Sequence, residues 1–210
     1  MDQAGLATAL VFDLREHSPF SFKCQVCSVC CSNKAIRVGP YEALRLARRL
    51  RITTTELLRT CTEEGGTILL NNPDGSCVFL GSRGCNVHPD RPLVCRLFPL
   101  GLLEDEQGAV KFAIMPLHPD CLGLVDTDGT VETYLESQGA TPYFRYEKLY
   151  STLYKRISAK LSPGRLLTLW ADIDGALAAC GCRQGSGRYG DLDDLVRLHV
   201  QAMKDRIVGL

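Results

Sequence analysis

The segment CQVCSVCC, residues 24–31, holds the side chains best suited to chemistry in this chain. Cys24, Cys27 and Cys30 recur at every third position, and a tight turn with this spacing can direct three thiols toward one point, as a metal or iron–sulfur site requires. Cys31 follows Cys30 directly, and consecutive side chains usually diverge from Cα atoms that lie about 3.8 Å apart. Either Cys31 therefore serves a second metal centre, or one of these two neighbours is a packed, inert thiol.

A second set of thiols lies downstream, at Cys77, Cys85, Cys95 and Cys121. The pattern around the first two predicts a β-hairpin with one thiol on each arm, because the turn residues GSRG separate two short apolar runs. A hairpin of this kind presents two ligands together to a metal. We therefore expect these four thiols to share in metal binding with the first segment.

Two arginines, Arg91 and Arg96, lie close to Cys95 in the sequence. Thiolates bound to a metal give the assembly a negative charge, and a nearby arginine can offset that charge or donate a hydrogen bond to sulfur. Three prolines between residues 89 and 99 stiffen the backbone, which suits a preorganised site. Both arginines are thus candidate cofactor-binding residues, with ordinary surface ion pairs as the alternative.

Composition limits the classes of protein to which the chain can belong. Its 210 residues include 11 cysteines, and 24 Lys and Arg residues balance 24 Asp and Glu residues. A zero net charge argues against a nucleic-acid-binding protein, and no apolar run approaches the roughly 20 residues that span a bilayer. With no signal peptide visible, we expect a cytoplasmic protein with reduced thiols, in which dense cysteines indicate metal binding before a disulfide scaffold.

The elements that would position the thiols follow from local start signals. Gly39 followed by Pro40 predicts the start of a helix, and Thr53 with Glu56 forms a capping box that starts a second, short helix. Cys61 lies at the end of this second helix, on its expected buried face. A free cysteine in such a place usually packs as a small apolar residue, so we predict that role for Cys61.

Strand signals are confined to the first two thirds of the chain. The expected strands are Ala35–Val38, Thr67–Leu70 and Val110–Met115, and residues 72–75 have the composition of a tight turn. The rest of the chain reads as helical because apolar residues recur at helical spacing after three start signals. These signals lie at Thr141-Pro142, Ser162-Pro163 and Asp191.

The predicted fold is α+β and mostly α. A cysteine-rich half of loops and a β-hairpin, residues 20–125, forms the metal-binding core and packs against a helical C-terminal part, residues 141–208. We expect a single domain over residues 1–210, because this length suffices for one well-packed core. For Cys180 and Cys182, near the end of a predicted helix, a packing role, an extra soft-metal site and a redox pair stay equally open.

The ordered motifs CQVCSVCC, GSCVFL, GCNVHPDRPLVCRLFP and DCLG resemble the YkgJ-like cysteine-cluster proteins. Those proteins are described as zinc- or iron-chelating domains, and the flagellin lysine N-methylases share their cysteine pattern. The resemblance places the family's arginine-proline and cysteine-arginine pairs on Arg91-Pro92 and Cys95-Arg96, and leaves Cys61, Cys180 and Cys182 outside the pattern. It implies eight metal ligands: Cys24, Cys27, Cys30, Cys31, Cys77, Cys85, Cys95 and Cys121.

Eight candidate thiols allow two arrangements. Two four-thiolate centres would use all eight and would give Cys30 and Cys31 one centre each; alternatively, a single cubane cluster takes Cys24, Cys27, Cys30 and one distant thiol. The C-x2-C-x2-C spacing resembles that of ferredoxins, although their closing Cys-Pro is absent. Zinc sites typically have two C-x2-C halves, of which only one is present here. We therefore expect one or two iron–sulfur clusters of the 4Fe-4S type, with zinc as the alternative.

Three functions fit these features. The first is an iron–sulfur protein in redox chemistry or electron transfer with a redox or protein partner, and it uses the whole thiol set. The second is an enzyme that methylates protein lysines with S-adenosylmethionine, which the resemblance supports through the cysteine pattern. The third is a structural zinc module, because small segments with few apolar contacts need a bound metal to stabilise their fold. An oxidoreductase, a methyltransferase and a protein without enzymatic activity are thus all compatible with the sequence.

Overall fold

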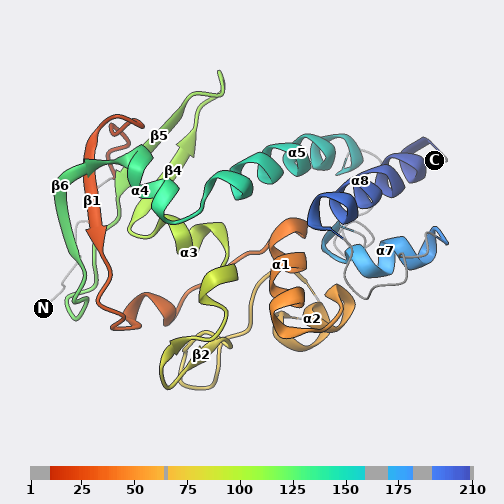
Figure 1. The fold of residues 1–210 in the computed structure, drawn as a ribbon, viewed down its shortest axis with the longest axis horizontal. Coiled ribbons are helices and arrows are strands. Elements are labelled where there is room, and N and C mark those ends of the chain that lie inside the picture. The colour runs from red at the N-terminus through yellow and green to blue at the C-terminus, as the bar shows by residue number, and fades with distance from the viewer. Residues whose placement is uncertain (1–9, 64–65, 159–169, 182–190, 209–210) are drawn as a thin grey trace, which may run out of the picture. The chain divides into compact units, whose positions relative to one another are not determined.

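The chain is divided into two units, each assembled from two separate stretches of sequence. The structure, a computed structural model, describes residues 10–63, 66–158, 170–181 and 191–208. Unit 1 comprises residues 1–30 and 94–140, and unit 2 comprises residues 31–93 and 141–210 (Figure 1). The chain passes from one unit to the other between the neighbouring thiols Cys30 and Cys31. That both units belong to one domain stays a prediction.

Unit 1 is built around two antiparallel sheets of two strands each. One sheet pairs β1 with β6, which run side by side, and the other pairs β4 with β5 (Figure 1). The elements of this unit are β1 (Pro19–Lys23), β4 (Leu100–Glu104), β5 (Val110–Ile114), β6 (Leu124–Thr130) and α4 (Val131–Ser137). Two short helices coincide with unit boundaries: η1 (Val29–Cys31) and α3 (Leu93–Leu97).

The register of the β1–β6 pair brings two thiol-bearing segments together. Lys23, the last residue of β1, is paired with Leu124, the first residue of β6. Cys24 therefore follows directly on one strand, and Cys121 precedes the other by three residues. Pairing between segments about a hundred residues apart thus positions the first thiol segment beside the last ligand candidate.

Aromatic residues form the core of unit 1. Phe20 and Phe112 are almost fully buried, and the ring of Phe20 meets that of Tyr134 edge-on, with 5.0 Å between the ring centroids. Phe22 meets Phe98 in the same way at 5.8 Å. Edge-to-face pairs of this kind contribute about 0.5–1.5 kcal/mol beyond their buried area. These contacts attach β1 to α4 and to the segment that follows Cys95.

Unit 2 is mostly helical. Its elements are α1 (Pro40–Leu50), α2 (Thr54–Cys61), β2 (Leu80–Gly81), β3 (Gly84–Cys85), η3 (His88–Asp90), α5 (Thr141–Ser158), α7 (Ile173–Ala179) and α8 (Leu192–Val208). Helices α1 and α2 begin where the sequence predicted: Gly39 caps α1, and the Thr53 hydroxyl accepts a hydrogen bond from the Glu56 N–H at 3.0 Å. With its small sheets and several helices, the protein has the predicted α+β fold, mostly α.

Two apolar clusters fill unit 2. The first contains the buried face of α5, in which Tyr146, Tyr150, Leu153 and Ile157 pack with residues of α1, α7 and α8. Leu149, which fits the helical spacing of apolar residues, is instead 40% exposed, because it lies off the stripe that the tyrosines define. The helix start expected at Ser162-Pro163 lies outside the described residues.

The second cluster lies beneath the thiol-bearing loops of unit 2. Its largest members are Leu46, Leu57, Leu69 and Phe79, and all four are buried. The strand expected over residues 67–70 is reduced to isolated bridges, one of them joining Ile68 to Arg37. The predicted hairpin is present as β2 and β3, with Leu80 paired to Cys85.

Candidate metal centre

Three thiols of unit 1 lie together. The Cys121 thiol donates a hydrogen bond to the Cys27 sulfur, and Cys30 is near enough for its charge to affect the pKa of both. Cys24, the most exposed of the predicted ligands, lies at the end of β1. Five of the eight predicted ligands, Cys95 included, thus lie in unit 1, and three of them are near enough to interact through hydrogen bonding or charge.

Backbone N–H groups are directed at these sulfurs in a repeated arrangement. In each case the donor is the residue two positions after the cysteine: Val26 for Cys24, at 3.4 Å, Val29 for Cys27, and Gly123 for Cys121. An N–H that donates to sulfur stabilises the thiolate, which is the form that binds metal. The three loops are therefore arranged to favour bound thiolates.

The pKa values of the Cys27 and Cys121 thiols move in opposite directions. Hydrogen bonds from the backbone N–H groups of Leu122 and Val29 lower the pKa of Cys27. For Cys121, the Gly123 N–H acts to lower the pKa, but burial and the charges of Cys27 and Cys30 raise it overall. The first thiolate of this group is thus expected on Cys27, and the ionisation of further thiols is opposed until a cation compensates their charge.

The first thiol segment contains two residues in the left-handed region. Val26 has φ 54° and Ser28 has φ 63°, and neither is glycine. This conformation costs roughly 1–2 kcal/mol for an L-residue, and most of all for a β-branched one. Residues held there against their preference often belong to functional sites. Here the turns direct the N–H groups of residues 26 and 29 at the sulfurs of Cys24 and Cys27.

This geometry makes opposite predictions for two substitutions of Val26. We expect Val26→Gly to retain the metal content of the wild type, because glycine adopts positive φ without steric cost. We expect Val26→Pro to reduce it, because proline fixes φ near −65° and lacks the N–H that contacts Cys24. Metal analysis of both purified variants checks this expectation. Equal metal content in the two variants would show that the turn is not needed.

The two predicted arginines have well-defined partners. Arg96 is only 5% exposed, and its guanidinium donates to the backbone carbonyl of Gln138, within unit 1. Arg91, in unit 2, donates to the His88 carbonyl at 2.7 Å. Cys95 is a partly buried, reduced cysteine on α3. The role of both arginines toward a cofactor stays a prediction.

The predicted ligands of unit 2 are joined by backbone hydrogen bonds. The Cys77 N–H donates to the Cys31 carbonyl at 2.8 Å, and the Leu80 N–H donates to the Cys77 carbonyl at the same distance. Leu80 is in turn paired with Cys85. The Cys77 sulfur also accepts from the N–H two residues later, that of Phe79, as the sulfurs of unit 1 do. These contacts place Cys31, Cys77 and Cys85 in one small region.

Cys61, which was predicted to pack as a small apolar residue, does so in this region. Cys61 packs against the same apolar cluster as Cys77 and Cys85, and its charge acts on the Cys77 thiol. Burial, which is the larger cause, and this charge both raise the pKa of Cys77, although the Phe79 N–H opposes the shift. The spacing of Cys61 matches no metal motif, and only the tertiary fold brings it to Cys77.

Two cysteines belong to neither group of thiols. Cys180 is disulfide-bonded, and Cys182 lies outside the described residues. Within the ranges that the structure describes, no three His, Cys, Asp or Glu side chains are yet arranged to hold a metal ion. The donor set nevertheless fits a soft metal, because the thiols are free and backbone N–H groups are directed at several sulfurs.

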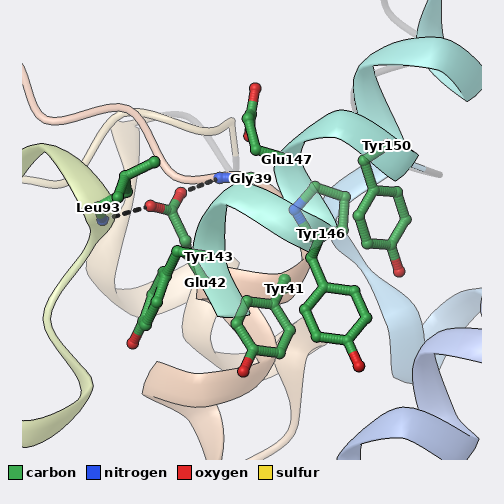
Figure 2. A pocket seen from close by; sticks show the side chains of 9 residues that line it. Gly39, Tyr41, Glu42, Leu93, Tyr143, Tyr146, Glu147 and Tyr150 are labelled. Atoms are coloured by element: carbon green, nitrogen blue, oxygen red, sulfur yellow. Dashed lines mark hydrogen bonds between the residues drawn. The ribbon is translucent and has the colours of Figure 1, made fainter. Parts of the chain in front are cut away.

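A small pocket of unit 2 is unrelated to the thiols. It is lined mainly by the rings of Tyr41, Tyr143, Tyr146 and Tyr150, as Figure 2 shows, and by no cysteine. The Glu42 carboxylate accepts hydrogen bonds from the N–H groups of Gly39 and Leu93, both at 2.6 Å (Figure 2). The carboxylate therefore caps the start of α1 and attaches the start of α3 to it. We assign this pocket to packing.

Comparisons with known proteins agree with the donor set. Residues 23–121 match the family described as "CxxCxxCC: Putative zinc- or iron-chelating domain". Over 134 residues the chain is 28% identical to the Uncharacterized protein MJ0661 of Methanocaldococcus jannaschii, covering 61% of this chain and 68% of that protein. No solved structure matches the chain. Among the described helices, none is both long and apolar enough to cross a membrane.

Proposed function

Because residues 23–121 match the CxxCxxCC family of zinc- or iron-chelating domains, we propose that this protein carries iron–sulfur clusters and acts in redox chemistry or electron transfer. The metal ligands are thiolates of both units. In unit 1 we assign Cys24, Cys27, Cys30 and Cys121 to one centre. In unit 2 we assign Cys31, Cys77 and Cys85 to a second. Cys95 stays a predicted ligand of unit 1.

The N–H groups directed at the sulfurs of Cys24, Cys27 and Cys121 carry this proposal. Hydrogen bonds to the sulfurs are one of the means by which a protein sets the reduction potential of an iron–sulfur cluster. A bound cluster supplies one-electron transfer. The chain's own residues hold it, stabilise its thiolate ligands and leave it accessible, since Cys24 is exposed and the other thiols are only partly buried.

The positive charges of two arginines and the abundance of thiols are consistent with the same function. Arg96 places a buried positive charge next to Cys95 in the sequence, where it offsets thiolate charge, and Arg91 is proposed to do the same from unit 2. Nine free thiols among the described residues favour a reducing compartment such as the cytoplasm. No observation on the described residues favours the methylase alternative, which stays a prediction of the sequence.

Anaerobic purification followed by metal and sulfide analysis tests this proposal. We expect a brown protein that contains iron and acid-labile sulfide in equal amounts, with broad visible absorption that bleaches on reduction. Mössbauer spectra then give the cluster type and number. A Cys27→Ser/Cys121→Ser variant provides the control and is expected to lose the absorption of the unit 1 centre. A colourless protein with stoichiometric zinc would contradict the proposal and favour a structural zinc module instead.

A further inference from the structure

The division into units leaves the second centre one ligand short. Of the eight predicted ligands, only Cys31, Cys77 and Cys85 lie in unit 2. A closed thiolate site needs four ligands, whether it holds zinc or a cluster. We propose that Cys61 is the fourth ligand of a soft-metal site in unit 2, together with these three thiols. The inference rests on the proposed metal binding and adds a residue that the family pattern leaves out.

Backbone hydrogen bonds place Cys61 one segment away from Cys77. The Leu70 N–H donates to the Cys61 carbonyl at 2.9 Å, and the Val78 N–H donates to the Leu70 carbonyl at 3.0 Å. Cys61, at the end of α2, and Val78 are therefore both hydrogen-bonded to Leu70. Cys77 directly precedes Val78, and its own N–H is bonded to the Cys31 carbonyl. The end of α2 is thus joined through two hydrogen bonds to the loop that carries the predicted ligands.

Packing places the side chains of three of these thiols against a single apolar cluster. Cys61, Cys77 and Cys85 are all partly buried and all pack against the cluster that contains Leu57 and Phe79. All three are reduced cysteines. Thiolates that are near one another and partly buried repel each other, and a bound cation removes that repulsion.

Metal binding at this site requires the cysteine side chains to move. No three metal-binding side chains yet converge among the described residues. A cysteine sulfur is repositioned by rotation about a single bond between staggered rotamers, and metal binding is commonly coupled to local ordering. Backbone hydrogen bonds join the segments that carry these cysteines, and the proposal requires their side chains to converge when the metal binds.

Titration with Co²⁺ of the metal-free full-length protein tests the role of Cys61. The Cys27→Ser/Cys121→Ser background disables unit 1, so that binding reports on unit 2. Adding Cys61→Ser should weaken Co²⁺ affinity by more than roughly 10- to 100-fold. That is the loss expected when a residue that only hydrogen-bonds to a metal ligand is replaced. The thiolate-to-cobalt absorption per bound ion should fall by about a quarter, because three thiolates replace four. Arg59→Lys, a charge-conserving change at an exposed residue of α2, serves as the control and should leave both quantities unchanged.

A second measurement uses the wild-type protein and avoids any loss of folding in the variant. Bound Co²⁺ should protect Cys61 from iodoacetamide, as peptide mass spectrometry measures, whereas Cys61 of the metal-free protein should react. Equal labelling with and without Co²⁺, or an unchanged affinity and absorption in the Cys61→Ser variant, would overturn the inference while metal binding stands. A wild-type protein that binds no metal ion would instead overturn the proposed function itself.

Discussion

Serine in place of Cys30 is expected to remove the metal of unit 1 and to leave that of unit 2, whereas serine in place of Cys31 is expected to do the reverse. Cys30 is in electrostatic contact with Cys27 and Cys121, while the carbonyl of Cys31 is bonded to the N–H of Cys77. The two residues are adjacent in the chain but belong to different units. Each substitution is therefore a matched control for the other.

The measurement is iron, zinc and sulfide per chain after anaerobic purification. With two four-thiolate centres of equal size, each single variant should lose about half of the metal and the double variant nearly all of it. Loss of all metal in both single variants would mean that the two thiols serve one centre. No loss in the Cys31→Ser variant would make the two-centre proposal wrong.

The second large effect concerns folding of unit 2, where Asp172→Ala is expected to lower the free energy of unfolding by about 3 kcal/mol. Asp172 is only 8% exposed. Its carboxylate accepts hydrogen bonds from the hydroxyls of Thr54 and Thr55 on α2 and from the Gly175 N–H at the start of α7. Alanine removes the cap of α7 and leaves the buried Thr54 hydroxyl with fewer acceptors.

Urea unfolding monitored by tryptophan fluorescence measures this effect. The chain has a single tryptophan, Trp170, which is buried in the first apolar cluster of unit 2, so its emission reports on that unit. Asp194→Ala on α8 is the control. Its carboxylate makes an exposed ion pair with Arg197, and we expect a change of less than about 0.5 kcal/mol. A loss below about 1 kcal/mol for Asp172→Ala would contradict the importance of the buried contacts.

Much of the local structure could be predicted from the sequence. The starts of α1 and α2, the turn at residues 72–75 and the hairpin of β2 and β3 are all present as predicted. Each depends on interactions between residues a few positions apart, such as the hydrogen bond of Thr53 with Glu56. Strand β5 was also predicted, from its alternating pattern.

Other elements escaped prediction because partners distant in sequence form them. Strand β6 contains the residues LVDTDGT, of which several have low β propensity, and it is a strand because β1 pairs with it. Strand β4 likewise forms by pairing with β5. A single sequence carries no local signal for such pairs. The pattern of polar and glycine residues in β6 would by itself favour a loop.

The thiols illustrate the same limit. The sequence alone determined that the chain is a thiol-rich, metal-binding protein, because cysteine number and spacing are chemical facts that need no fold. It could not show that a boundary between two units falls between Cys30 and Cys31, or that Cys61 lies near Cys77. The tertiary structure determines these placements of the thiols, since they depend on backbone hydrogen bonds and apolar packing between segments far apart in the chain.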